Sequence, residues 1–118
     1  RWHAANGLDV QKSITVNLET GKVYQLNNLF KPNSGYRRVL TKLIQKQIEE
    51  KEIPLLEEIK SIPDNQEFYM TKDALVIYFQ EIEYTPHSVG IPEFPIPYYQ
   101  IKSLISDYGP IARFVRQA

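Results

Sequence analysis

The sequence contains no cysteine in its 118 residues. A disulfide scaffold, a cysteine-ligated zinc site and thiol catalysis are therefore all excluded. Lysine and arginine together number 14, as do aspartate and glutamate, so that the formal net charge at pH 7 is zero. This balance argues against a polybasic protein that binds nucleic acid or an anionic membrane surface.

Long apolar runs and catalytic motifs are missing as well. The most apolar run, Leu75–Phe79, is far shorter than the roughly 20 residues that span a bilayer, so we expect no membrane insertion. The chain has no glycine-rich phosphate loop, no His-Glu-x-x-His motif and no nucleophile elbow. These absences favour a non-enzymatic protein without a metal or cofactor. With 42% hydrophobic and 12% aromatic residues, the chain can still bury a substantial core.

The zero net charge conceals a difference between the two halves of the chain. Up to Lys60, basic residues outnumber acidic ones, whereas residues 61–109 contain many acids and only Lys72 and Lys102 as bases. This second stretch also carries most of the tyrosines and prolines. We therefore expect an acidic, aromatic surface built from the second half.

Residue patterns predict two hairpins and one main helix. Alternation over residues 13–18, with a return over 23–26, is typical of a hairpin, and residues 67–80 predict a second one. Apolar residues at helical spacing begin at Tyr36, and Asn33 or Ser34 are suited to cap the helix. Leu29 and Phe30, in the loop before it, are predicted to plug the core.

Prolines limit these elements. Pro54 predicts a kink or restart of the helix, with an apolar stripe continuing through Ile59. Four prolines in residues 80–99 predict irregular backbone or an edge strand, and residues 99–105 fit one short helix. The expected fold is α+β, with an antiparallel sheet built from hairpins and one main kinked helix packed on one face. We expect residues 1–118 to form a single domain.

Few side chains suggest chemistry. His87 with Glu81, Glu83 or Glu93 has the residue types of a metal site or of a hydrolase, and Glu81 and Glu83 are expected to share one strand face. We favour the plainer interpretation of a surface histidine and a solvated strand face, because catalytic carboxylates normally come from different elements.

A second cluster is basic. Arg37, Arg38, Lys42 and Lys46 lie on neighbouring turns of the predicted helix and form a basic stripe. We interpret the stripe as an ordinary solvated face, because three glutamates follow between residues 49 and 52.

The stretch Tyr84–Tyr99 is rich in proline and aromatic residues. Proline lowers the entropy cost of binding and aromatic rings offer contact area, so this stretch is a candidate recognition loop. The alternative is that its apolar side chains only pin a long crossover to the core. The candidate contact residues are Tyr84, Pro86, His87, Ile91, Glu93 and Phe94.

Three segments, Gln25–Pro32, Phe68–Asp73 and above all Tyr84–Tyr98, resemble the domain-of-unknown-function family 3298. This is the RsiV-like C-terminal domain of bacterial anti-sigma factors, which also occurs beside peptidoglycan deacetylase domains of the PdaC type. The resemblance implies an extracytoplasmic domain of a longer exported or membrane-tethered protein. It also implies a partner such as lysozyme, a basic protein, or peptidoglycan. The alternative is an accessory structural domain packed against a deacetylase domain.

Overall fold

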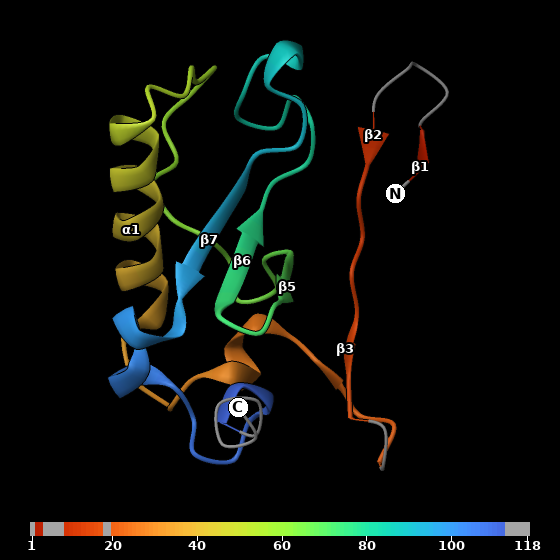
Figure 1. The fold of residues 1–118 in the computed structure, drawn as a ribbon, viewed down its shortest axis with the longest axis vertical. Coiled ribbons are helices and arrows are strands. Elements are labelled where there is room, and N and C mark those ends of the chain that lie inside the picture. Colours follow the sequence, from red (N-terminus) through yellow and green to blue (C-terminus); the bar gives the residue numbers. More distant parts are fainter. Residues whose placement is uncertain (1, 4–8, 18–19, 113–118) are drawn as a thin grey trace.

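The centre of the fold is a three-stranded antiparallel sheet with one helix on one side, as Figure 1 shows. The computed structural model describes residues 2–3, 9–17 and 20–112. The sheet has the strand order β5-β6-β7, with β5 at Phe68–Met70, β6 at Ala74–Tyr78 and β7 at Glu93–Pro97. The predicted α+β class is confirmed.

Proline places β7 at the edge of this sheet. Pro95 pairs with Val76 and Pro97 with Ala74. Proline has no backbone N–H to donate to a hydrogen-bond ladder, and within sheets it is therefore confined to edge strands. The central strand β6 comes from the apolar run, whose residues from Leu75 onward are buried on both faces. The predicted second hairpin is confirmed, because Thr71 N–H bonds Ala74 O at 2.9 Å between β5 and β6.

Helix α1 (Tyr36–Glu50) covers one face of the sheet. Its buried residues Leu40, Ile44 and Ile48 recur every four positions and so form one stripe. The stripe belongs to one hydrophobic cluster with Ile77 and Phe94 of the sheet. The amphipathic pattern therefore gave the correct face of the helix.

Both ends of α1 differ from the prediction. At the start, Gly35 is the N-cap in a left-handed conformation, and neither Asn33 nor Ser34 caps the helix through its side chain. At the end, Glu52 has a φ of 53° and Ile53 N–H bonds Ile48 O at 3.0 Å. This is the Schellman arrangement, which terminates a helix.

The predicted kink or restart of the helix at Pro54 is therefore wrong. The Schellman arrangement ends α1 before the proline is reached, and residues 51–61 contain no helix. Proline is common just after such an ending because it cannot continue a helix. Pro54 therefore correctly indicates that the helix cannot continue through this segment, but the helix ends there and does not restart.

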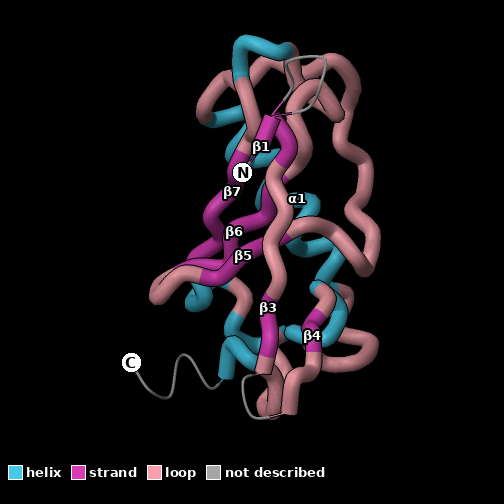
Figure 2. The backbone as a smooth tube through the Cα atoms, turned by 90° about the vertical axis from the view of Figure 1, so that its right-hand side faces the viewer, coloured by secondary structure: helices cyan, strands magenta, loops and turns pink. Residues whose placement is uncertain are grey.

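The other face of the sheet is covered by residues 9–17, which pass in front of the sheet in Figure 2. Ser13 Oγ lies 2.6 Å from the hydroxyl of Tyr78, and Tyr78 O–H also donates to Glu67 Oε2 at 2.9 Å. The Gln80 side chain bonds both backbone groups of Gln11, at 3.0 and 2.6 Å. Hydrogen bonds thus hold residues 11–13 against the sheet, whereas apolar packing holds α1 against its other face.

The remaining strands are very short. Strands β1 (Trp2–His3) and β2 (Asp9–Val10) pair antiparallel, as do β3 (Thr15–Val16) and β4 (Val23–Tyr24). The latter pair confirms the first predicted hairpin, whose turn uses Gly21 at φ 73°. Its apolar face is exposed, and 74% of the Ile14 surface is accessible.

The segments around the core are 3-10 turns. Turn η1 (Leu26–Leu29) buries Leu29, and Phe30 follows it into the core, as predicted. The prediction of a single helix over residues 99–105 is wrong. Two 3-10 turns, η3 (Tyr98–Gln100) and η4 (Lys102–Leu104), replace it.

Residues 113–118 lie outside the part of the chain that the structure describes. Within the described ranges, no helix has the length and apolar character needed to cross a membrane.

Candidate functional site

The candidate recognition loop connects β6 to β7 and starts with a tight turn. Glu83 N–H bonds Gln80 O at 3.1 Å, and the Glu83 carboxylate accepts a bond from Gln80 N–H at 3.1 Å. Turn η2 (His87–Val89) follows, and Gly90 at φ 75° ends it. The irregular backbone predicted for this proline-rich stretch is confirmed up to the start of β7.

Two features of this loop are costly for folding. Ile82 has a φ of 69°, a left-handed conformation that is a genuine outlier for a β-branched residue. The Thr85 side chain is fully buried, at 0% exposure, and its Oγ1 has no hydrogen-bond partner among the described residues. Strain and unsatisfied polar groups tend to cluster at functional sites, so they mark this loop for attention.

Glu81 and His87 contact each other within the loop. His87 Nδ1 lies 3.0 Å from Glu81 Oε1, and the Glu81 side chain is only 5% exposed. Glu83, by contrast, is exposed on the same turn. The prediction that Glu81 and Glu83 share a strand face is therefore wrong, because residues 81–83 form a turn. Among the residues that the structure describes, no group of three or more histidines and carboxylates converges on one point.

The structure buries one of the six predicted contact residues. Phe94 is fully buried, with its ring 6.0 Å from that of Phe79 in an edge-to-face arrangement. It cannot touch a partner, so the crossover-pinning interpretation holds for this side chain. Tyr84, Pro86 and Ile91 are half-buried, whereas His87 and Glu93 are exposed.

Tyr84 and Glu93 each have a neighbour that defines their role. The Tyr84 ring packs on Phe79 with centroids 5.1 Å apart, so it anchors the loop. Glu93 faces Tyr69, and burial followed by the hydrogen bond to Glu93 raises the pKa of the Tyr69 hydroxyl. Glu93 thus belongs to the sheet surface beside Tyr69.

A second loop completes the site, and sequence reasoning missed it. The loop after α1 lies at the same end of the molecule as the β6–β7 loop, as Figure 1 shows. Leu56 N–H bonds Tyr84 O at 2.6 Å. Burial raises the pKa of Tyr84, and the nearby carboxylates of Glu83 and Glu57 raise it further. Acids from both halves of the chain therefore meet at this point.

We call the exposed residues Leu56, Glu57, Ile82 and Glu83 the acidic surface. Leu56 is 58% exposed and Ile82 is 39% exposed, although both are large apolar residues. Exposed large apolar side chains with charged side chains beside them match the anatomy of protein interfaces, in which an apolar centre is surrounded by a polar rim. The sequence signal for this surface was the group of glutamates between residues 49 and 58. These acids lie in the half of the chain that was counted as basic overall, so they were not considered together with the acids of the second half.

Comparisons with known proteins agree with the resemblance predicted from the sequence. The family model described as "Protein of unknown function (DUF3298)" matches residues 27–99. The anti-sigma-V factor RsiV of Bacillus subtilis is 32% identical over 113 residues, which cover 86% of this chain and 39% of RsiV. A crystal structure of a DUF3298 member from Bacteroides fragilis shares the fold with a TM-score of 0.71 at 21% identity, covering 98% of this chain and 48% of that one. This chain therefore spans less than half of either relative, and it belongs to the DUF3298 family.

Proposed function

We propose that this domain is a non-enzymatic binding module of an extracytoplasmic sensing protein, and that its acidic surface contacts a basic protein such as lysozyme. The similarity to the anti-sigma-V factor RsiV supports a sensing role. Carboxylates on the surface steer a basic partner during diffusional encounter and raise the association rate.

The observation that carries the proposal is the junction of two loops at the hydrogen bond between Leu56 and Tyr84. It places two exposed apolar side chains, Leu56 and Ile82, beside the carboxylates of Glu57 and Glu83. A few anchor side chains supply most of the binding energy in interfaces, and charges around them supply specificity and association rate. The arrangement therefore suits a basic protein with an apolar patch.

The geometry of Glu81 and His87 supports a binding role more than a hydrolytic one. A carboxylate that acts as general acid or base must reach the substrate, and the Glu81 side chain is almost completely covered. Its contact with the His87 imidazole connects the start of the β6–β7 loop with turn η2. This pair therefore serves to hold the loop that carries Ile82.

Calorimetric titration with lysozyme tests the proposal. The variant Glu57→Gln/Glu83→Gln removes two charges but keeps the acceptor that Glu83 offers to Gln80 N–H. We expect about tenfold weaker binding, mainly from slower association, and a weaker dependence on salt. The control Asp73→Asn removes one exposed charge from the β5–β6 turn and should leave binding unchanged.

Two results would contradict the proposal. One is the absence of saturable lysozyme binding by the wild-type domain. The other is an effect per charge removed that is as large in the control as in the double variant, which would indicate attraction by overall charge. Saturable binding of peptidoglycan fragments in place of lysozyme would assign the surface to a glycan and also reject the protein partner.

A second candidate function, an accessory domain packed against a neighbouring deacetylase domain, rests on a different surface. The hairpin β3–β4 exposes Ile14, Val16 and Val23, whose apolar side chains would suit burial against another domain. Amide hydrogen exchange over residues 13–24 tests this role. Protection in a longer natural chain but not in the isolated domain would favour packing, and equal exchange in both would reject it.

A further inference from the structure

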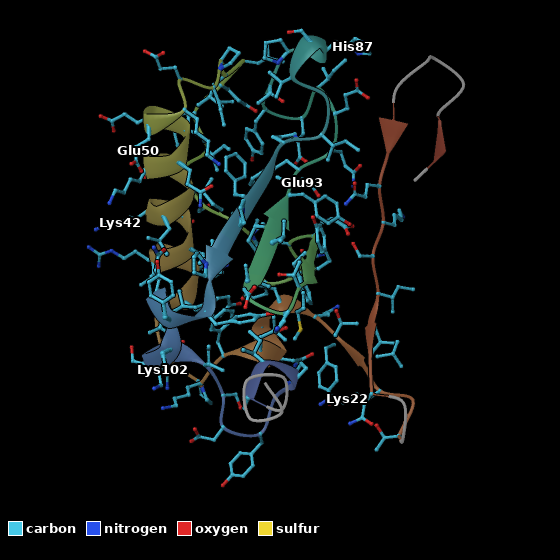
Figure 3. All side chains as sticks on the ribbon, in the orientation of Figure 1. Lys22, Lys42, Glu50, His87, Glu93 and Lys102 are labelled. Carbon is cyan, nitrogen blue, oxygen red and sulfur yellow. The ribbon has the colours of Figure 1, made fainter. Side chains whose placement is uncertain are left out.

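A basic cleft lies between α1 and the segment at residues 60–61, away from the acidic surface. Its volume is about 330 Å³. Four of its lining residues are cations: Arg37, Arg38, Lys42 and Lys60. Within residues 2–3, 9–17 and 20–112, no carboxylate lines it. Figure 3 shows Lys42 on the side of α1 that faces away from the sheet.

The walls of the cleft are held by hydrogen bonds that do not involve the cationic groups. Gln45 Nε2 donates to Ile59 O at 2.7 Å, which ties the segment before Lys60 to the helix. The buried Thr41 hydroxyl donates to Arg37 O at 2.7 Å. Ile59 is itself buried in the core. The distance between the helix and Lys60 is therefore set by the fold and does not depend on a ligand.

The positive charge of the cleft is poorly compensated within the chain. Arg37 lies 3.7 Å from Asp64, but both side chains are more than half exposed, so this pair neutralises little. The glutamates expected from the sequence to balance the stripe lie at the other end of α1. At 1.5 Å per residue, Glu49 is about 10 Å from Lys42 and about 17 Å from Arg38 along the helix, and both distances exceed a Debye length of about 8 Å.

The start of α1 adds to the preference for an anion. Arg37 and Arg38 occupy the first turn, where cations are disfavoured by the helix dipole. The first turn contains no acid, and Gly35 provides no side-chain cap. A second hollow of about 270 Å³ lies at this end of the helix and is lined by both arginines. An anion in the cleft would relieve the repulsion among these groups.

We propose that the basic cleft binds phosphate groups, either of a small phosphorylated molecule or of a phosphodiester polymer. The guanidinium fork of arginine matches phosphate oxygens with two parallel hydrogen bonds, and lysine adds a point charge. Arg38 and Lys42 are four residues apart on one helix face, so both reach the same ligand. This site is independent of the acidic surface and of the partner proposed for it.

Calorimetry with sodium tripolyphosphate and with inorganic phosphate tests the inference. We expect saturable binding to the wild-type domain and a loss of about tenfold or more in Arg38→Gln/Lys42→Gln, because two charge-assisted donors are removed. The matched pair of single variants is Lys42→Gln, which should weaken binding, and Lys22→Gln, the control. Figure 3 shows Lys22 on the opposite side of the molecule, so this variant should bind as the wild type does.

The source of the phosphate is distinguished by a parallel titration with poly(glycerol phosphate). Tighter binding of the polymer assigns the cleft to a phosphodiester chain, and tighter binding of tripolyphosphate assigns it to a small ligand. Amide chemical shifts should change at residues 36–42 and 60–61 in either case. If the double variant melts early, Lys42→Gln alone replaces it.

Three results would overturn the inference. They are the absence of saturable binding, an equal loss in Lys22→Gln and Lys42→Gln, and equal binding of poly-L-glutamate at matched charge. The first removes the site, the second indicates attraction by overall charge, and the third removes the preference for phosphate.

Discussion

Replacing Thr85 by valine should stabilise the domain. The Thr85 side chain is fully buried and its hydroxyl has no partner among the described residues. A buried polar group without a hydrogen bond costs about 1–3 kcal/mol. Valine has nearly the same shape and is β-branched too, so it removes this cost without opening a cavity. We expect a gain of about 1–2 kcal/mol in the free energy of unfolding.

The same substitution at Thr41 is the matched control. Thr41 is also buried, but its hydroxyl donates to Arg37 O at 2.7 Å. Thr41→Val therefore loses a hydrogen bond, and we expect a destabilisation of about 0.5–1.5 kcal/mol. The two variants share one chemical change and should shift stability in opposite directions.

Urea unfolding followed by circular dichroism measures both effects. Thr85→Val should raise the midpoint with an unchanged slope. For a domain of this size, the expected gain corresponds to a rise of about 3–10 °C in the melting temperature. If Thr85→Val were destabilised as much as Thr41→Val, the Thr85 hydroxyl would have a native partner such as a bound water, and the argument that the loop carries an unsatisfied group would fail.

Three further predictions concern the helix end, alkaline pH and the core. Glu52→Gly should stabilise by about 1 kcal/mol in thermal unfolding, because glycine adopts the left-handed conformation at no steric cost, whereas Glu49→Gly inside the helix should destabilise by about 0.5–1 kcal/mol; a loss in both would reject the Schellman assignment. Burial and nearby Asp73 raise the pKa of Tyr98 from 10.0 to about 12, so folding favours the protonated hydroxyl. The raised pKa therefore contributes to the free energy of unfolding below pH 10, and this contribution is lost as pH rises to 12. Urea unfolding across that range should show the stability of the wild type approaching that of Tyr98→Phe, and a constant difference between the two would contradict the pKa shift. Phe94→Ala should cost about 3–5 kcal/mol in urea unfolding, whereas a loss below 0.5 kcal/mol, typical of surface positions, would return Phe94 to the surface.

The candidate site could be predicted from the sequence only in part. The proline-rich stretch identified the β6–β7 loop, and the acids within it were visible. The residues between Pro54 and Ile59 were expected to continue or restart the helix, because a short apolar stripe does not by itself distinguish a helix from an irregular segment packed on the core. Phe94 was taken as a contact residue because aromatic residues are common in interfaces and in cores alike.

Patterns that depend on near neighbours were decided by the sequence alone. Alternation predicted the first hairpin and β-forming residues predicted the second, the prolines of residues 80–99 predicted irregular backbone or an edge strand, and helical spacing predicted the buried face of α1. These follow from local stereochemistry, which needs no knowledge of the rest of the chain. Family membership was also readable from local motifs.

Only the tertiary structure decided where charges gather. The hydrogen bond between Leu56 and Tyr84 brings acids of the first half beside those of the second, and the docking of Ile59 places Lys60 opposite Arg38. Charge counts along the chain cannot reveal such groupings, because screened electrostatic interactions depend on distances in space that the packing of the core sets. The zero net charge of the sequence thus becomes an acidic surface at one end of the fold and a basic cleft along the helix.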